Sequence, residues 1–250
     1  MLSDAQRAAL RRDGYVVLPG AVPGPLVDRA LAAINQSLGK GLDPRRLEEY
    51  RSRSFCPELQ KDGAITDLAV RSEVWAAAES LLGAGRVKRP RTGQIALCFP
   101  APGVPGRAHP HLDGMYSPTN GVPRGDVLSF TMLAGVMLSD VPAPSSGNLV
   151  VWPGTHEAYQ DYFRRRGPKA LLEGMPDVPL GAPVPVTGHA GDAVLCHWQL
   201  AHAAGPNTSP HVRYAAYFRL EHVDHGRQRW ECLTDIWREW PGATDGDRAG

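Results

Sequence analysis

The chain has 250 residues, and its 27 Lys and Arg residues balance 26 Asp and Glu residues, for a formal net charge of +1 at pH 7. A charge this close to zero argues against a protein that binds nucleic acid or an anionic membrane surface. No stretch of eighteen apolar residues predicts a transmembrane helix, and Met1 to Asp4 do not form the start of a signal peptide. We therefore expect a cytoplasmic protein with a single domain over residues 1–250 and no nucleic-acid, membrane or obligate protein partner.

The four cysteines lie far apart and form no C-x-x-C pair. Their spacing fits neither a zinc cluster nor the dense disulfide framework of a small secreted domain. We expect reduced, partly buried thiols at Cys56, Cys98, Cys196 and Cys232.

The first part of the chain has the pattern of helices that cover a core. Ser3 and Gln6 form a candidate capping box at the start of the first helix, which should end at Gly14. A short apolar run over residues 15–18 predicts a strand. Two further stretches, PGPLVDRALAAINQSLGK and TDLAVRSEVWAAAESLLG, each have apolar residues at helical spacing. These elements predict an N-terminal helical layer over about residues 1–85.

The character of the sequence changes from about residue 86 to a succession of short apolar runs that Gly and Pro separate. Many short strands with frequent turns predict a mainly β core, a sandwich or barrel, over about residues 86–225. A short helical segment is expected over about residues 228–240. The strand candidates are GQIALCF, RAHPHLD, DVLSFTMLAGVMLSD, GNLVVWPG, APVPVTG, GDAVLCHW and VRYAAYFRLEHV.

A long polar segment over about residues 157–183 interrupts these strands and is expected to be partly helical. Long insertions in β-scaffolds often form lids over a site, but a surface excursion without function has the same sequence signature. Both interpretations remain open at this point.

Three potential metal ligands, His109, His111 and Asp113, occupy alternate positions in HPHLD. Side chains at alternate positions of a strand leave the same face, so His111 and Asp113 can reach one ion. Two histidines and one carboxylate typically hold Fe(II) in dioxygen chemistry and leave three coordination positions open. The best third ligand is His202, near the end of an apolar strand, whereas His197, five residues earlier, should face the other way.

One further histidine, His109, and one arginine, Arg213, are relevant to this site. A cupin-type pair of His109 and His111 would want a glutamate shortly afterwards, and residues 114–124 contain none. His109 is therefore expected to support a ligand or line the pocket, or else to be a plain surface histidine. Arg213 opens the apolar strand RYAAYFRL, where a buried guanidinium needs a partner such as a carboxylate.

The order and spacing of these motifs resemble the phytanoyl-CoA dioxygenase family of Fe(II)- and 2-oxoglutarate-dependent oxygenases. The likeness extends from LSDAQRAALRRDGYVVLPGAV through the H-x-D pair and GNLVVWPGTH to GDAVLCHWQLAHAAGPNTSPHVR and RYAAYFRL. It implies a double-stranded β-helix, a cupin-like jelly roll, with helices packed on it. It further implies that His111, Asp113 and His202 bind iron and act in catalysis, and that Arg213 binds the distal carboxylate of 2-oxoglutarate.

The resemblance implies an enzyme that hydroxylates a C–H bond of a small organic substrate with dioxygen and forms succinate and carbon dioxide. Halogenating relatives replace the carboxylate ligand with a small residue, so Asp113 favours hydroxylation. Two alternatives remain: a cupin-like metal-dependent isomerase or dioxygenase without 2-oxoglutarate, and a non-catalytic binding relative.

The chain departs from the family at some positions. Some members have a serine where this chain has Ala204, and some have a tryptophan in the strand that here reads SFTMLAGVML. Gln94 and Thr131 are candidates for replacement contacts with 2-oxoglutarate. Near the motifs, the candidates for lining the substrate pocket are Arg107, His109, Tyr116, Trp152 and Trp198, with His156 close by.

Overall fold

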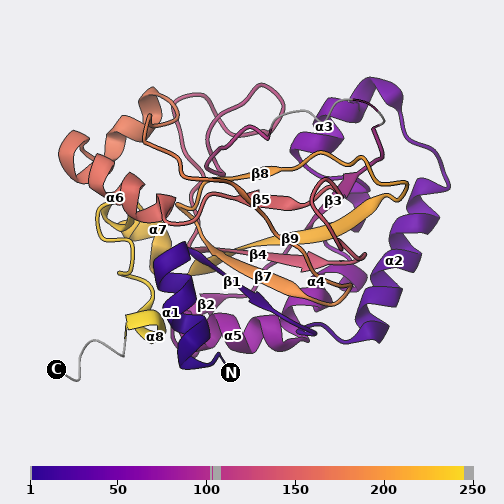
Figure 1. The fold of residues 1–250 in the computed structure, drawn as a ribbon, viewed down its shortest axis with the longest axis horizontal. Coiled ribbons are helices and arrows are strands. Elements are labelled where there is room, and N and C mark those ends of the chain that lie inside the picture. Colours follow the sequence, from indigo (N-terminus) through magenta and orange to yellow (C-terminus); the bar gives the residue numbers. More distant parts are fainter. Residues whose placement is uncertain (1, 102, 104–107, 245–250) are drawn as a thin grey trace.

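Two antiparallel sheets of unequal size form the centre of the molecule (Figure 1). The computed structural model describes residues 2–101, 103 and 108–244. The larger sheet has the strand order β1-β7-β4-β9-β2, with β3 also pairing with β9, and the smaller sheet has the order β6-β5-β8. The strands are β1 (Tyr15–Leu18), β2 (Val87–Lys88), β3 (Gln94–Cys98), β4 (Met132–Met137), β5 (Leu149–Val151), β6 (Val184–Pro185), β7 (Ala193–His197), β8 (His202–Ala204) and β9 (Arg213–His222).

The larger sheet is covered on both faces, which explains why its central strands β4 and β7 are almost wholly apolar and buried. In β9, Ala216, Phe218 and Leu220 belong to a core shared with the N-terminal helices. In β4 and β7, Leu133 and Val194 belong to a second core shared with the smaller sheet. Because successive side chains of a strand alternate between faces, one strand contributes to both cores. Two facing antiparallel sheets with helices on one side confirm the expected cupin-like fold.

Most of the N-terminal helices pack on the side of the larger sheet away from β5 and β8, whereas the helix over Leu47–Ser52 lies near the level of β8 (Figure 1). The capping box of Ser3 and Gln6 is confirmed, and Gly14 ends the first helix in the left-handed conformation, with φ 79°. The helices are α1 (Asp4–Asp13), α2 (Gly24–Leu38), α3 (Leu47–Ser52), α4 (Gly63–Val70) and α5 (Glu73–Leu82), with short 3-10 turns at Pro44–Arg46 and Pro57–Leu59.

The structure corrects three local expectations. The stretch TDLAVRSEVWAAAESLLG is not one helix, because Ser72 accepts a hydrogen bond from the Val74 backbone and so starts α5 anew. Residues 108–113 do not form a strand; His111 instead makes an isolated bridge with His202. His197 and His202 do not share a strand, since β7 ends at the first and β8 begins at the second.

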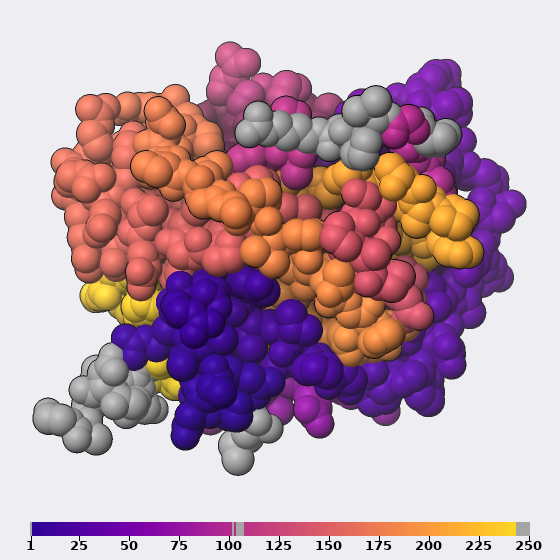
Figure 2. Space-filling view, viewed as in Figure 1, coloured from indigo at the N-terminus to yellow at the C-terminus, as the bar shows by residue number. Residues whose placement is uncertain are grey.

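The segment after β5 is partly helical, as expected, with α6 (Thr155–Arg166) and a 3-10 helix at Pro168–Glu173. Buried Tyr159 and Phe163 attach α6 to the second core. In the space-filling view this helix and the chain that follows it form one continuous surface beside α1 (Figure 2). The chain continues after β9 with α7 (His225–Gln228), a 3-10 turn at Glu231–Leu233 and α8 (Pro241–Thr244).

Within the described part of the chain, no helix combines the length and the apolar character that crossing a bilayer requires.

Candidate metal centre

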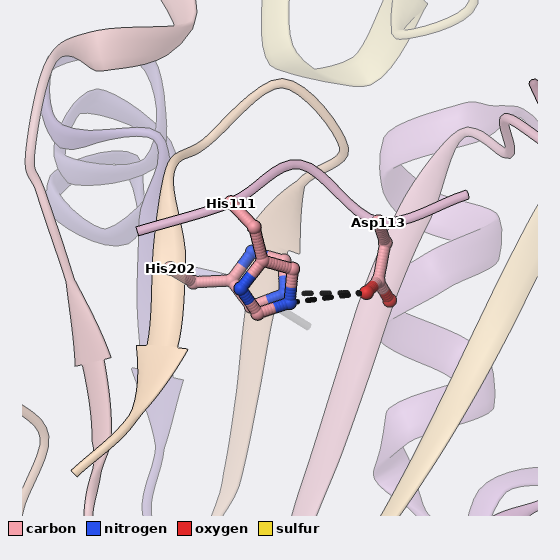
Figure 3. Close-up of side chains that lie close together, drawn as sticks. All are labelled: His111, Asp113 and His202. Carbon is pink, nitrogen blue, oxygen red and sulfur yellow. Dashed lines mark ion pairs between the residues drawn. The ribbon is translucent and has the colours of Figure 1, made fainter. Parts of the chain in front are cut away.

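His111, Asp113 and His202 meet at one point between the two sheets (Figure 3). His111 and Asp113 lie in the segment before β4, and His202 is the first residue of β8. Two backbone hydrogen bonds between His111 and His202, of 3.0 and 3.2 Å, hold these segments together. Asp113 Oδ1 lies 3.5 Å from His111 Nε2 and 3.7 Å from His202 Nε2. The three residues predicted as ligands are thus brought together from positions up to 91 apart in the sequence.

The backbone sets which nitrogen of each histidine faces the centre. His202 Nδ1 lies 3.0 Å from the Leu200 carbonyl, and His111 Nδ1 lies 3.4 Å from the His109 carbonyl. A carbonyl can only accept, so it favours a proton on Nδ1 and leaves the lone pair of Nε2 pointing at Asp113. This is the tautomer that a metal ligand needs.

The charge of the centre is set by burial and by a nearby cation. Burial alone would raise the pKa of Asp113, but the Arg219 guanidinium, together with the neighbouring His111 and His202 imidazoles, holds it well below its usual range. Burial alone would lower the pKa of His202, but the neighbouring Asp113 carboxylate raises it overall. The centre therefore presents an ionised carboxylate to any cation that enters.

The donor set fits iron. Two imidazole nitrogens and one carboxylate oxygen form the ligand set of non-haem Fe(II) oxygenases, and all ligand atoms lie within 4.8 Å of one another. The side chains of Asp113 and His202 are mostly buried, whereas that of His111 is 51% exposed. All three residues line a pocket of about 640 Å³, which has room for a co-substrate and a substrate beside the ion.

Arg213 lines the same pocket and is buried at the start of β9. Its Nε donates to the Gly147 carbonyl at 2.6 Å, and its Nη1 donates to the Ala96 carbonyl at 2.9 Å. Among the described residues its guanidinium makes no ion pair with a carboxylate. Neutral carbonyls orient the group without compensating its charge, so the pocket favours an anion at this position.

Arg219 is the residue of the site that the sequence analysis missed. It lies six positions after Arg213 on β9, so the two side chains leave the same face of the strand. Its Nη2 lies 2.8 Å from Asp113 Oδ2 and donates to Gln94 Oε1 at 3.0 Å. The even spacing from Arg213 was the available signal, but no sequence pattern pointed to Asp113 as its partner.

The two residues proposed as replacement contacts for 2-oxoglutarate lie in different places. Gln94 lines the pocket and accepts a hydrogen bond from Arg219. Thr131 is buried outside the pocket, where its hydroxyl donates to Glu239 at 2.5 Å and accepts from the His222 backbone. The prediction for Thr131 is therefore wrong, because its hydroxyl serves a buried network elsewhere.

The residues predicted to line the substrate pocket also lie in different places. Tyr116 lines the metal pocket, whereas His109 and Trp152 line a neighbouring pocket of about 500 Å³. Trp198 is buried and lines neither, so its expected place in the pocket wall is corrected; its Nε1 donates to the Asp113 carbonyl at 3.1 Å and supports that ligand's backbone. Arg107 lies outside the described residues.

The segment over residues 157–183 reaches the metal pocket through Gly174 and Met175, which line it. Its basic run at the end of α6 does not: Arg164 donates to the Thr234 carbonyl, and Arg166 lies 3.5 Å from Glu173. His156 is also remote from the pocket, fully buried with Nε2 against the Arg11 carbonyl.

Comparison with solved structures shows the same fold in proteins that are described as alpha-ketoglutarate-dependent or were crystallised with a metal and 2-oxoglutarate. The epimerase SnoN, crystallised with Fe³⁺, alpha-ketoglutarate and nogalamycin RO, is 22% identical with a TM-score of 0.60, over 88% of this chain and 83% of that one. The carbocyclase SnoK from nogalamycin biosynthesis is 22% identical with a TM-score of 0.56, over 91% and 90%. HygX from Streptomyces hygroscopicus, with nickel and 2-oxoglutarate bound, is 17% identical with a TM-score of 0.59, over 89% and 88%.

No curated protein sequence matches the chain. A model of the phytanoyl-CoA dioxygenase family matches residues 10–215, which include His111, Asp113, His202 and Arg213. With most of the chain matched, this protein belongs to the phytanoyl-CoA dioxygenase family.

Proposed function

We propose that the protein is an Fe(II)- and 2-oxoglutarate-dependent dioxygenase that hydroxylates a C–H bond of a small organic molecule and forms succinate and carbon dioxide. Family membership and the iron and 2-oxoglutarate bound to neighbours of the same fold support this proposal. The observation that carries it is Arg213, a buried cation without a described acidic partner, in the same pocket as the three ligand side chains.

The chemistry of 2-oxoglutarate matches this arrangement. Its 2-oxo acid end can chelate a metal, and its distal carboxylate can accept hydrogen bonds from a guanidinium. His111, Asp113 and His202 would hold the iron, and Arg213 would bind the distal carboxylate. Bound Fe(II) would supply the activation of dioxygen.

Other residues of the chain hold this geometry. Gly147 and Ala96 fix the direction of Arg213 through their carbonyls, and Trp198 fixes the backbone of Asp113. Leu133 and Leu149 give the pocket an apolar wall on the side of the two sheets. An apolar wall beside the bound substrate favours its oxidation over side reactions with solvent.

The same site can support other outcomes, since two neighbours of this fold are described as an epimerase and a carbocyclase. Hydroxylation differs from both because an oxygen atom from dioxygen enters the product. Mass spectrometry of the product formed under ¹⁸O₂ would show this directly. If succinate forms together with a product that carries no ¹⁸O, the reaction is epimerisation or ring closure and not hydroxylation.

The first test is an anaerobic titration of the metal-free protein with Fe(II) and then 2-oxoglutarate, followed by the visible metal-to-ligand charge-transfer band. We expect the band in the wild type, its loss in His202→Ala, and a much higher 2-oxoglutarate requirement in Arg213→Ala. Arg164→Ala is the matched control, because this exposed arginine of α6 does not line the pocket.

Other outcomes of the titration would select an alternative. Tight iron binding without a band, and turnover that does not need Arg213, would favour a cupin-like enzyme that works without 2-oxoglutarate. If the charge-transfer band appears but no tested substrate leads to succinate formation, a non-catalytic binding protein is favoured.

A further inference from the structure

The two oxygens of the Asp113 carboxylate have different surroundings. Oδ1 faces the histidines, 3.5 Å from His111 Nε2 and 3.7 Å from His202 Nε2. Oδ2 faces Arg219 and accepts from its Nε at 3.0 Å, with its Nη2 at 2.8 Å. One oxygen is therefore directed to the proposed metal position, and the other is held by a cation.

Arg219 is itself held in place by two further contacts. Its Nη2 donates to Gln94 Oε1 at 3.0 Å, and its guanidinium carbon lies 5.8 Å from the centre of the Phe130 ring. On the other side of the ligand, Trp198 donates to the Asp113 carbonyl. The carboxylate is thus fixed both through its backbone and through its outer oxygen, which restricts its rotation about the Cβ–Cγ bond.

The number of oxygens that Asp113 offers decides how many coordination positions stay open. A carboxylate can bind a metal through one oxygen or through both. A ligand set of two histidines and a one-oxygen carboxylate leaves three positions free, whereas a two-oxygen carboxylate takes one of them. Charge-assisted hydrogen bonds to Oδ2 occupy its lone pairs and make it a poor second ligand.

We propose that Arg219 is a positioning residue that confines metal binding to Oδ1 of Asp113 and so keeps open a coordination position for 2-oxoglutarate or dioxygen. The inference rests on the proposed function, because it takes the triad as the iron site. It adds a role for an arginine that neither binds the metal nor corresponds to the proposed 2-oxoglutarate contact at Arg213.

Infrared spectroscopy can test the ligation mode without any turnover. The full-length protein, labelled with ¹³C at aspartate carboxyls, is loaded anaerobically with Fe(II), and the metal-induced difference spectrum is recorded. The gap between the antisymmetric and symmetric carboxylate stretches is wide for one-oxygen and narrow for two-oxygen ligation. We expect a wide gap in the wild type and a narrow gap in Arg219→Met, with a 2-oxoglutarate Kd raised about tenfold, in the range of supporting-residue changes at metal sites.

Two further variants test whether the change in the spectrum is due to the loss of the charged donor to Asp113. Arg219→Lys keeps a charged donor for Oδ2 and should retain the wide gap. Glu221 lies on the same strand as Arg219 and pairs with Lys88 of β2. Glu221→Gln removes this exposed ion pair and should give the wild-type spectrum, because Glu221 does not contact Asp113. If Arg219→Met does not fold, Arg219→Ala at this half-exposed position tests the same prediction.

The failures of the two proposals are distinguishable. A wild-type protein that binds neither Fe(II) nor 2-oxoglutarate overturns the proposed function and this inference with it. The wild type can show the charge-transfer band while the iron-loaded Arg219→Met variant keeps the wide gap between its carboxylate stretches. That result would overturn the role of Arg219 and leave the proposed function intact.

Discussion

In the part of the chain that the structure describes, two clusters of potential metal ligands have their ligand atoms within 4.8 Å of one another, and the two clusters differ in their surroundings. The open cluster, His111, Asp113 and His202, lines a pocket of about 640 Å³. In the closed cluster, made of His225, Cys232 and Glu239, the histidine and the glutamate are almost fully buried. Both contain residue types that bind metals, so composition alone does not separate them.

Hydrogen bonding separates them. In the closed cluster, Glu239 Oε2 accepts from Thr131 and lies 2.9 Å from His225 Nδ1, and its Oε1 accepts from Gln228. His225 Nε2 lies 2.9 Å from the Ser129 hydroxyl. A metal would have to break these contacts. In the open cluster, by contrast, the Nε2 atoms of both histidines have no hydrogen-bond partner among the described residues and lie 3.5 and 3.7 Å from Asp113 Oδ1.

The comparison shows that a fully satisfied cluster serves stability, whereas a cluster with converging lone pairs beside a cavity serves binding. Burial alone would raise the pKa of Glu239, but hydrogen bonds from His225 and Thr131 lower it to about 2. The carboxylate stays ionised and ties the chain after β9 to the segment before β4.

The largest expected effect is the loss of metal binding when the open cluster loses a ligand. His202→Ala should weaken Fe(II) binding by more than about 100-fold, because even supporting contacts are worth 10–100-fold at such sites. Anaerobic Fe(II) titration measures it. Glu239→Gln should leave the iron affinity unchanged, and a comparable loss in that variant would mean that the closed cluster also contributes to metal binding.

Breaking the closed cluster should instead lower the stability of the fold. Glu239→Ala leaves His225 and Thr131 without their buried acceptor, and removing one partner of such a pair costs about 3–5 kcal/mol. The free energy of unfolding from urea denaturation of the metal-free protein gives this value. A loss below about 1 kcal/mol would show that the network contributes little.

A buried histidine near the closed cluster should make stability depend on pH. Burial and the proximity of His156 lower the pKa of His197 to about 3, although the Ile236 carbonyl and Glu239 oppose this shift. The Gln199 backbone donates to its Nδ1, and its Nε2 lies 2.9 Å from the Ile236 carbonyl. In the unfolded chain His197 is expected to take up a proton near pH 6.5, whereas in the folded protein it does so only near pH 3. The free energy of unfolding should therefore be highest above pH 6.5. It should fall by up to about 1.4 kcal/mol for each pH unit as the pH drops towards 3.

Urea denaturation at several pH values between 7 and 4 checks this dependence. His197→Gln removes the titrating group, so its stability should fall less steeply with decreasing pH than that of the wild type. Equal slopes in the two proteins would assign the pH dependence to other groups.

The smallest expected effect concerns the support of the open cluster. Trp198→Phe keeps the ring packing but removes the hydrogen bond to the Asp113 carbonyl. We expect about tenfold weaker Fe(II) binding and a loss of about 1 kcal/mol in the free energy of unfolding. A large loss of stability with unchanged iron affinity would assign Trp198 to packing alone.

Local sequence patterns predict much of the fold and of the site. The capping box at Ser3, the apolar runs of the strands, the H-x-D pair of His111 and Asp113, and the short motif from His202 to Arg213 are local features. Each depends on residue types at fixed intervals, so each can be recognised before the chain is folded. The family resemblance rests on the same features and is confirmed.

Other properties depend on which distant segments meet, and only the tertiary structure decides that. Arg219 and Asp113 are 106 positions apart, and Thr131 and Glu239 are 108 apart. Whether a polar side chain lines the pocket or joins a buried network depends on strand register and on the path of the chain after β9. No local pattern contains that information, because the energy of a buried charge is set by the partner that folding brings to it.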